Sequence, residues 1–365
     1  MQKKKVLVAM SGGVDSSVAA ALLLEEGYEV TGATMQIWPD ETPLPASETG
    51  CCSLAAVEDA RHVAHRLDIP FYVLNFKGIF EEKVIDYFVD EYLSGRTPNP
   101  CIACNRYIKF GALLKKAHML GFDYIATGHY ANIEFDASRG RYVLLKAKDA
   151  NKDQTYVLYG LTQEQLKRTL FPLGPYIKPE IRTMAKRYGF SVADKPESQE
   201  ICFIPDNNYR DFIQNKSKGE EIKPGPFMDT KGNVIGQHRG IPFYTIGQRK
   251  GLGIALGYPA YVIDIIPKSN AIILGRFEEL GGQALLAANV NFIPFGELKH
   301  AMSVSAKIRY KAEEVKAEIC PSFLGTNFAE IHFSEQQNAI TPGQAVVFYQ
   351  GSLVIGGGTI TKRLE

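Results

Sequence analysis

The stretch from Val6 to Glu26 constrains the fold of this chain more than any other. Its first part, Val6–Met10, is an apolar run with β-branched residues, which predicts a buried strand. Ser11–Gly13 then predicts a turn, and Ser16–Glu26 combines strong helix formers with helical apolar spacing. A glycine-rich turn between a strand and a helix favours anion binding, because the first N–H groups of the helix lack partners and its dipole adds positive charge. We therefore expect this loop to bind phosphate.

The residue order of the loop narrows its nucleotide chemistry. No Gly-Lys-Ser or Gly-Lys-Thr follows the glycines, so the loop is not a Walker A motif. Ser-Gly-Gly-x-Asp-Ser instead resembles the loop of the ATP pyrophosphatases, and that resemblance implies cleavage of ATP between its α- and β-phosphates with transfer of AMP. Asp15 is then a candidate catalytic residue that helps to place Mg²⁺ beside the pyrophosphate. The alternative is an ordinary helix start in which Asp15 only interacts with the helix dipole.

Length and composition exclude several classes of protein. The chain has 365 residues, enough for two or three domains, and a net charge of +1, so it is not a globally basic nucleic-acid binder. No apolar run approaches the roughly 20 residues of a membrane span, and Met1–Lys5 leads directly into the first strand, so no signal peptide is expected. We predict a cytoplasmic protein, in which six cysteines favour thiol chemistry or metal binding over structural disulfides.

The first part of the chain alternates strands with helices. Strand-like runs at 29–37, 71–76 and 124–127 follow the first strand, with helical patterns between them. This alternation predicts an α/β fold with a doubly wound parallel sheet, of the adenine nucleotide α-hydrolase or PP-loop type. Ligands of such sheets bind beyond the carboxyl ends of the strands, so Met35 and the Gly128–His129 turn should lie beside the glycine-rich loop.

The rest of the chain has a different texture. Residues 131–148 predict a β-hairpin within the first domain, which we place at 1–209. Short strands with frequent glycine and proline predict a small mixed domain at 210–283. Five strand-like runs beyond residue 288 predict an antiparallel β-barrel in a C-terminal domain at 284–365.

Three cysteines suggest which reaction the nucleotide supports. Cys101 and Cys104 form a Cys-x-x-Cys motif just before a helix that we expect to begin at Asn105, where the helix dipole would lower a thiol pKa. Cys202 follows in a separate loop that ends in proline. An AMP-forming loop together with these thiols suggests that ATP adenylates a carbonyl oxygen and that sulfur then displaces it.

Stretches along nearly the whole chain match one family. They are SGGVDSS, GRTPNPCIACN with IKFG, ATGHYA, KDQTYVLYGL, PESQEICFIP, YTIGQRKGLGI and TPGQAVVFY. In these stretches the chain resembles the tRNA-specific 2-thiouridylases of the MnmA family. The resemblance implies that sulfur replaces the 2-oxygen of the wobble uridine of tRNA, with ATP as activator. It also implies a protein persulfide that a cysteine desulfurase or a sulfur-relay protein supplies.

The resemblance implies roles for individual residues as well. Cys104 corresponds to the nucleophile and Cys202 to the cysteine that carries the persulfide. The ATP contacts correspond to Ala9, Met10, Ser11, Gly12, Gly13, Val14, Asp15, Ser16, Met35 and Gly128. The segment that meets the target base corresponds to Asn99, Pro100 and Cys101. The tRNA contacts correspond to His129, Lys152, Asp153, Gln154, Arg309, Tyr310 and Gln344.

The cysteines leave a metal-binding alternative open. Some members of the family have an acidic residue where this chain has Cys101. Cys101, Cys104 and Cys202 could therefore hold an iron–sulfur cluster or zinc, since three thiolates with an open position suit either. Cys101 could equally be a small half-buried residue without a catalytic part.

Other candidate residues receive simpler interpretations. One group at helical spacing could bind a metal, although a solvated helix face is favoured; its members are Asp59, His62 and His65. Cys51 and Cys52 form a loop pair without an assigned role. Cys320 lies in an expected barrel strand and is predicted to be a core thiol.

Thr230–Ile263, a basic segment without acidic residues, is the candidate RNA-binding surface. Its loop at Arg249 and Lys250 is of the kind that follows phosphates, although a solvated surface loop is the alternative. Two other functions are the alternatives: an ATP-dependent ligase or amidotransferase with the same fold that acts on a small metabolite, and a non-catalytic nucleotide- or tRNA-binding protein whose cysteines form a metal clip. Pyrophosphate release that depends on tRNA would separate the three functions.

Overall fold

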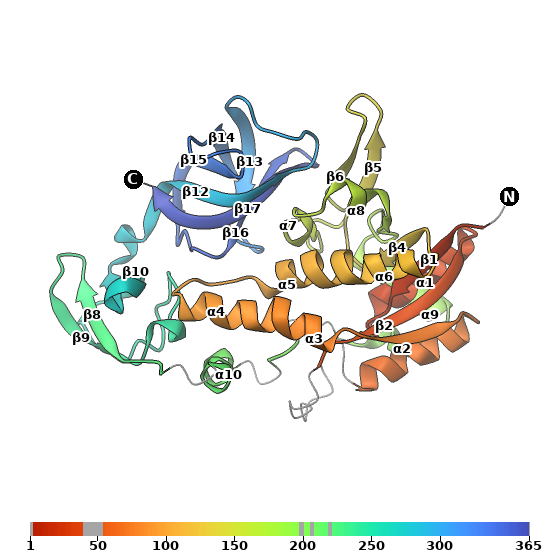
Figure 1. Cartoon of the computed structure of the whole chain (residues 1–365), viewed down its shortest axis with the longest axis horizontal. Helices are drawn as coiled ribbons and strands as arrows, with labels where there is room; N and C mark the ends of the chain where they lie inside the picture. The colour runs from red at the N-terminus through yellow and green to blue at the C-terminus, as the bar shows by residue number, and fades with distance from the viewer. Residues whose placement is uncertain (1–2, 39–53, 197–200, 205–207, 218–220, 365) are drawn as a thin grey trace.

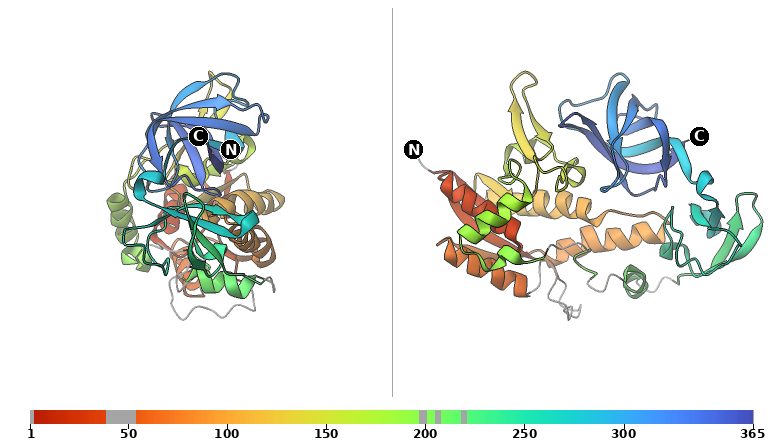
Figure 2. Two further views of the ribbon diagram at one scale, coloured as in Figure 1. Left: turned by 90° about the vertical axis from the view of Figure 1, so that its left-hand side faces the viewer. Right: turned by 180° about the vertical axis from the view of Figure 1, so that it is seen from behind.

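The computed structural model describes residues 3–38, 54–196, 201–204, 208–217 and 221–364. Figure 1 shows an elongated molecule, with a parallel sheet and its helices at one end, a small β domain at the other, and a β-barrel beside the long helices between them. The views in Figure 2 show the same arrangement. No helix within the described ranges is long and apolar enough to cross a membrane.

The N-terminal domain contains the predicted parallel sheet. Its strands have the order β3-β2-β1-β4-β7, and all neighbours pair in parallel. This order confirms the doubly wound α/β prediction, with the very short β7 as a strand that the sequence did not indicate. The strands are β1 (Lys5–Ala9), β2 (Glu29–Gln36), β3 (Phe71–Asn75), β4 (Tyr124–Thr127) and β7 (Thr169–Leu170).

Alternate side chains of β1 enter two different cores, because successive residues of a strand point to opposite faces. Val6 and Val8 pack with helices α1, α2 and α9 on one face, while Leu7 and Ala9 pack on the other face with two long helical segments. The three helices are α1 (Val14–Glu25), α2 (Leu54–Arg66) and α9 (Lys178–Arg187). Burial on both faces explains why the sequence of β1 is an uninterrupted apolar run.

The two long helical segments each contain π-helical turns. The first comprises α3 (Lys77–Phe80), η1 (Glu81–Asp86) and α4 (Tyr87–Leu93). The second comprises α5 (Pro100–Ala103), η2 (Cys104–Leu113) and α6 (Leu114–Met119). Both segments run between the sheet and the middle domain in Figure 1, so they connect the two ends of the molecule.

The second helical segment begins earlier than we expected. The predicted start was Asn105, but α5 starts at Pro100, and the Asn99 side chain accepts hydrogen bonds from two N–H groups of the first turn. An asparagine cap followed by proline at the first helical position is a favourable helix start. Cys101 therefore lies in the first turn and Cys104 in the second, so the prediction that Cys104 precedes the helix is wrong.

The middle domain is a four-stranded sheet with its own small core around Phe227. Its strand order is β10-β11-β8-β9, and β10 and β11 form an antiparallel hairpin. Helix α10 (Tyr209–Lys216) precedes this sheet in the chain. The strands are β8 (Gly225–Asp229), β9 (Val234–His238), β10 (Tyr261–Ile266) and β11 (Ala271–Gly275).

Six antiparallel strands form the C-terminal barrel, which pairing between β12 and β17 closes. The barrel prediction is confirmed, with β12 as a strand beyond the five expected runs. The strands are β12 (Gly281–Phe292), β13 (Met302–Lys307), β14 (Val315–Pro321), β15 (Phe328–Asn338), β16 (Ala345–Gln350) and β17 (Leu353–Leu364).

The predicted hairpin of the first domain extends the barrel sheet. It consists of β5 (Asn132–Asp136) and β6 (Arg141–Leu145). Leu145 of β6 pairs with Leu353 of β17, so one sheet crosses the boundary between the two domains. Two short helices follow the hairpin, α7 (Thr155–Leu158) and α8 (Gln163–Lys167).

All three domains meet on residues 95–98, which join the two long helical segments. The Gln344 side chain of the barrel donates to the carbonyl oxygens of Thr97 and Pro98, at 2.9 and 3.2 Å. The Thr97 hydroxyl lies 3.3 Å from the hydroxyl of Thr245 in the middle domain. These contacts fix the backbone directly before the helix that carries Cys101 and Cys104.

Substitution of Gly343 should test this junction. Gly343 has a φ of +92°, and a Cβ atom there would lie 2.8 Å from the Thr97 carbonyl oxygen. We expect Gly343→Ala to lower the free energy of unfolding by about 1–3 kcal/mol more than Gly351→Ala does. Both variants strain the backbone, but only the added methyl group at Gly343 also collides with a neighbouring segment. Gly351 is the matched control, since its φ is +60° and nothing lies within 4 Å of a Cβ there. Equal thermal midpoints for the two variants would contradict this expectation.

Candidate active site

The glycine-rich loop has the geometry of an anion site. Gly12 has a φ of +66°, and a Cβ atom there would lie 2.2 Å from the carbonyl oxygen of Ala56, so the position requires glycine. The Ser16 hydroxyl accepts the N–H of Ser11 at 3.1 Å and closes the loop. Helix α1 begins after Gly13, which offers no side-chain cap, so the first N–H groups of α1 suit an anion.

A partly buried ion pair holds the acidic residue of the loop. Lys178 Nζ, at the start of α9, lies 2.7 Å from both carboxylate oxygens of Asp15, and only 9% of the Lys178 side chain is exposed. The Tyr130 hydroxyl donates to Asp15 Oδ1 at 2.7 Å. Neither partner is apparent from the sequence, because no motif links residues this far apart in the chain.

A second lysine approaches the loop from another segment. Lys195 Nζ lies 3.3 Å from the Gly12 carbonyl oxygen and 2.6 Å from Asp59 Oδ2. Asp59 thus pairs with an ammonium group, while His62 and His65 are exposed. Within the described residues, no group of three or more His, Cys, Asp or Glu side chains could hold a metal ion. Asp59 therefore belongs to an ion pair with Lys195, and the two histidines lie on the exposed face of α2.

The turn after β4 lies against the start of α1. A Cβ atom at Gly128 would lie 2.7 Å from the Ser16 nitrogen and 2.8 Å from the Asp15 carbonyl carbon. Met35, near the end of β2, is half-buried against the core that also contains Ala9. Both positions thus lie at the sheet edge that carries the loop, while their contact with ATP stays a prediction.

Two cysteines pack against the same core as β1. Cys104 and Cys202 are half-buried and contact the core that includes Ala9, whereas Cys101 is exposed. These three cysteines belong to the described part of the chain, where no side-chain cluster has the geometry of a metal site. The arrangement brings the candidate nucleophile and the candidate persulfide carrier to one core.

The remaining cysteines differ from expectation or lie outside the structure. Cys320 is only half-buried, because alternation along β14 turns its neighbour Ile319 into the barrel core instead. The prediction of a core thiol is therefore wrong. Burial raises the pKa of the Cys320 thiol, and the nearby carboxylates of Glu318 and Glu330 raise it further. The Cys51–Cys52 pair lies outside the described residues.

His129, a predicted tRNA contact, is buried. Its Nδ1 lies 2.7 Å from the Thr127 hydroxyl, and the rings of Phe110 and Phe171 each have their centroid 5.9 Å from its own. Burial, together with the charge of Lys109, holds the pKa of His129 well below its ordinary value, so the ring is neutral. Contact with RNA would require this ring to become exposed.

Two further predicted tRNA contacts bond within the protein. Gln154 Oε1 accepts the N–H of Tyr130 at 2.9 Å. Asp153 accepts the Ala147 N–H at 2.8 Å, at the end of the β5–β6 hairpin. Because the Tyr130 hydroxyl also donates to Asp15, Gln154 positions a residue that contacts the glycine-rich loop.

The exposed members of the predicted tRNA set lie on the other two domains. Arg309 is exposed and donates to the Asn338 carbonyl oxygen at 2.7 Å, and 38% of Tyr310 is exposed. Arg249 and Lys250 are exposed in the middle domain. Lys152 is half-buried. The exposed cations of this set are therefore available for phosphate contacts.

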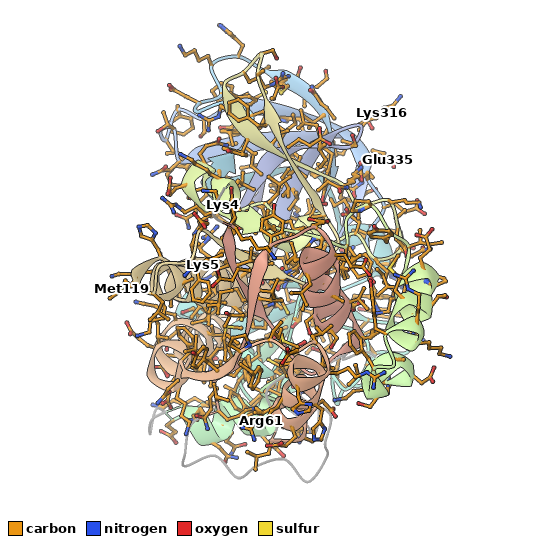
Figure 3. All side chains as sticks on the ribbon, turned by 90° about the vertical axis from the view of Figure 1, so that its right-hand side faces the viewer. Lys4, Lys5, Arg61, Met119, Lys316 and Glu335 are labelled. Atoms are coloured by element: carbon orange, nitrogen blue, oxygen red, sulfur yellow. The ribbon has the colours of Figure 1, made fainter. Side chains whose placement is uncertain are left out.

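Three labelled cations mark the sheet end of the molecule. Figure 3 views that end and shows Lys4 and Lys5 near one another, with Arg61 at a distance from both. Lys4 also pairs with Asp123 at 3.2 Å. Because the net charge of the chain is only +1, a nucleic acid would have to be held by a local set of residues.

Three family models match successive parts of the chain. The tRNA methyl transferase HUP domain matches residues 4–206, the tRNA methyl transferase PRC-barrel domain matches residues 210–276, and the Aminomethyltransferase beta-barrel domain matches residues 282–360. The three matches follow the parallel sheet, the middle sheet and the closed barrel in order.

Curated relatives match along nearly the full length. The tRNA-specific 2-thiouridylase MnmA of Moorella thermoacetica is 61% identical over 97% of this chain and 98% of its own. The tRNA-specific 2-thiouridylase MnmA of Carboxydothermus hydrogenoformans is 58% identical over 99% of both chains. A solved complex of a 4-thiouridine synthetase with RNA and bound ATP is 18% identical over 58% of this chain and 50% of that one, with a TM-score of 0.35. By its identity to the curated relatives, the chain belongs to the MnmA family of tRNA-specific 2-thiouridylases.

Proposed function

We propose that this chain replaces the 2-oxygen of the wobble uridine of tRNA with sulfur, at the expense of ATP. The observation that carries the proposal is the common core of the site: the strand that leads into the phosphate loop, the Cys104 helix and Cys202 all pack against it. Relatives that are 58% and 61% identical are named tRNA-specific 2-thiouridylases. We further propose that the enzyme acts in the cytoplasm and receives sulfur from a cysteine desulfurase or a sulfur-relay protein.

The first step of the proposed reaction is adenylation. The uridine 2-oxygen attacks the α-phosphorus of ATP, an O–P bond forms, and the bond from that phosphorus to the bridging oxygen breaks, so that pyrophosphate leaves. The N–H groups at the start of α1 and the ammonium group of Lys178 would offset the negative charge on the leaving group. Lys178 is thereby a candidate that the sequence did not reveal.

Lys178 occupies the carboxylate that a Mg²⁺ ion at this loop would use. One carboxylate together with phosphate oxygens is a ligand set that Mg²⁺ accepts. Both oxygens of Asp15, the predicted ligand, are however already paired with Lys178. We therefore assign the cationic role beside the pyrophosphate to Lys178.

The second step transfers sulfur. The terminal sulfur of a Cys202 persulfide attacks C2 of the adenylated uridine, a C–S bond forms, and AMP leaves with the oxygen. The Cys104 thiolate then attacks the Cys202 sulfur and breaks the S–S bond. The products are 2-thiouridine and a Cys104–Cys202 disulfide, which a thiol reductant must open before the donor loads another persulfide. Before that attack, Cys104 acts as an acid–base group.

Pyrophosphate release that requires tRNA is the first test of this function. The proposed enzyme should release pyrophosphate from ATP only when tRNA is present. A ligase or amidotransferase would release it with a small metabolite instead, and a non-catalytic binding protein would not release it at all. Either of those results would overturn the proposal.

Substitution of single cysteines should separate activation from sulfur transfer. We expect Cys202→Ser to lose thiolation and to keep tRNA-dependent pyrophosphate release, because the phosphate loop is unchanged. Cys101→Ser, a change on the same helix, is the matched control and should keep more thiolation than Cys104→Ser. Mass spectrometry of digested tRNA measures the product. Thiolation by Cys202→Ser would exclude the relay, and loss of iron, labile sulfide and activity together in Cys101→Ser would favour a cluster.

Removal of the Lys178 ammonium group should slow the first step. We expect Lys178→Met to reduce tRNA-dependent pyrophosphate release by about 100-fold or more, because a buried group that offsets developing charge is lost. Lys148→Met is the control, since Lys148 pairs at the surface with Glu180, which lies on α9 like Lys178. Thermal unfolding of both variants distinguishes lost chemistry from lost folding. Unchanged release by a folded Lys178→Met protein would reduce Lys178 to a structural partner of Asp15.

The basic loop of the middle domain should contribute to tRNA affinity through phosphate contacts. We expect changing Arg249 and Lys250 together to Ala to lower the salt slope of tRNA binding by about 1.4–1.8. Changing Lys4 and Lys5 together to Ala removes two cations at the sheet end that pair with Asp123 and Glu29, and should leave the slope unchanged. Filter binding at several salt concentrations measures both variants. An unchanged slope in the Arg249 and Lys250 variant would favour the solvated surface loop.

A further inference from the structure

A pocket of about 400 Å³ lies between the long helical segments and the barrel. Its helix side is lined by Tyr87, Glu91, Arg96, Asn99, Arg106 and Tyr107. Its barrel side comes from β12, β17 and the loop before β16, including Asn289 and Gly343. None of the described residues assigned to ATP or to sulfur transfer lines it, so its use needs a separate explanation.

The pocket occupies a different helix face from the cysteines. Asn99, Ala103 and Arg106 line it at the spacing of one helix face, while Cys101 and Cys104 lie on the same segment and do not line it. The predicted target-base segment therefore touches the pocket through Asn99. Its other end, at Cys101, lies on the helix face that also carries Cys104. A nucleotide adjacent in the RNA chain to the one held at this segment would be near the pocket.

The groups that line the pocket suit a nucleobase with its phosphate. Tyr107 is 41% exposed, so one aromatic ring is accessible at the rim. Arg96 pairs with Glu91, while the Arg106 guanidinium adds a second cation and bonds to the Tyr159 side chain. Single-stranded RNA is recognised by stacking of bases on aromatic rings or guanidinium planes and by contacts to phosphates. The Asn289 amide, on the opposite wall, can both donate to and accept from a base edge.

We propose that this pocket binds the base of a nucleotide next to the target uridine, by stacking on Tyr107. The proposal rests on the proposed function, since it takes the RNA to be the substrate of the cysteine site. Because one wall is the barrel, binding of this base also connects the RNA to both domains. The pocket thus contributes to substrate choice through the neighbour of the modified nucleotide.

Abasic tRNAs and variants of Tyr107 test the proposal. We expect Tyr107→Ala to weaken tRNA binding about 5- to 100-fold, as loss of one stacked base does, and Tyr107→Phe to restore it, because stacking needs only the ring. Tyr72→Ala is the matched control, since Tyr72 is 57% exposed on β3, away from the pocket walls. A tRNA that lacks one base beside the target should bind wild-type protein about as weakly as intact tRNA binds Tyr107→Ala.

The combined measurement identifies the occupant. The abasic tRNA should bind Tyr107→Ala no more weakly than intact tRNA does, because the stacked pair is already lost. Two results would overturn the proposal and leave the pocket as a gap between domains. One is that removing the base and removing the Tyr107 ring weaken tRNA binding additively; the other is that removing either base beside the target leaves binding to wild-type protein unchanged. ATP affinity without tRNA should be unchanged in Tyr107→Ala, and its loss would assign the pocket to the nucleotide cofactor instead. Thiolation of intact tRNA by the wild-type protein is measured in parallel, so failure of the pocket and failure of the proposed function are distinguishable.

Discussion

The contact of the barrel with residues 95–98 is the constraint on which the arrangement of the site depends. The carbonyl groups of Thr97 and Pro98 both accept hydrogen bonds from Gln344. Asn99, the next residue, caps the helix that carries Cys101 and Cys104. A displacement of the barrel therefore moves the cap and the first helical turn, and the position of the cysteines depends on a domain outside their own.

The glycine-rich loop is also connected to the barrel, through a second set of contacts. The β5–β6 hairpin pairs with β17 through Leu145 and Leu353, and the bond between Gln154 and the Tyr130 N–H closes the base of that hairpin. Tyr130 in turn donates to Asp15 of the glycine-rich loop. The glycine-rich loop and the cysteine helix thus belong to one domain, but the contacts that support each of them lead to the barrel.

Local patterns made some of these features predictable and others not. The strand, loop and helix between residues 6 and 26 follow from apolar periodicity and from glycines at a turn, which are properties of neighbouring residues. The helix start at Pro100 was misplaced because a proline-rich stretch suggests a loop, although Asn99 before proline is itself a start signal. Lys178 and Asp15 are 163 residues apart, and only the folded sheet brings them together. The same limit hid the pocket at Tyr107, whose second wall belongs to the barrel.

The hydrogen bonds of Gln344 set a condition on its predicted contact with tRNA. A glutamine amide nitrogen has two hydrogens, and here that nitrogen donates to both Thr97 and Pro98. To bind RNA through this nitrogen, Gln344 must release at least one of these carbonyl groups, and His129 must likewise leave a buried position. Contact through the Gln344 amide nitrogen and its observed bonds to both Thr97 and Pro98 therefore exclude one another. If Gln344 contacts tRNA through this nitrogen, at least one bond between the barrel and the backbone before α5 breaks, and RNA binding reaches the cysteine helix through the bond that it replaces.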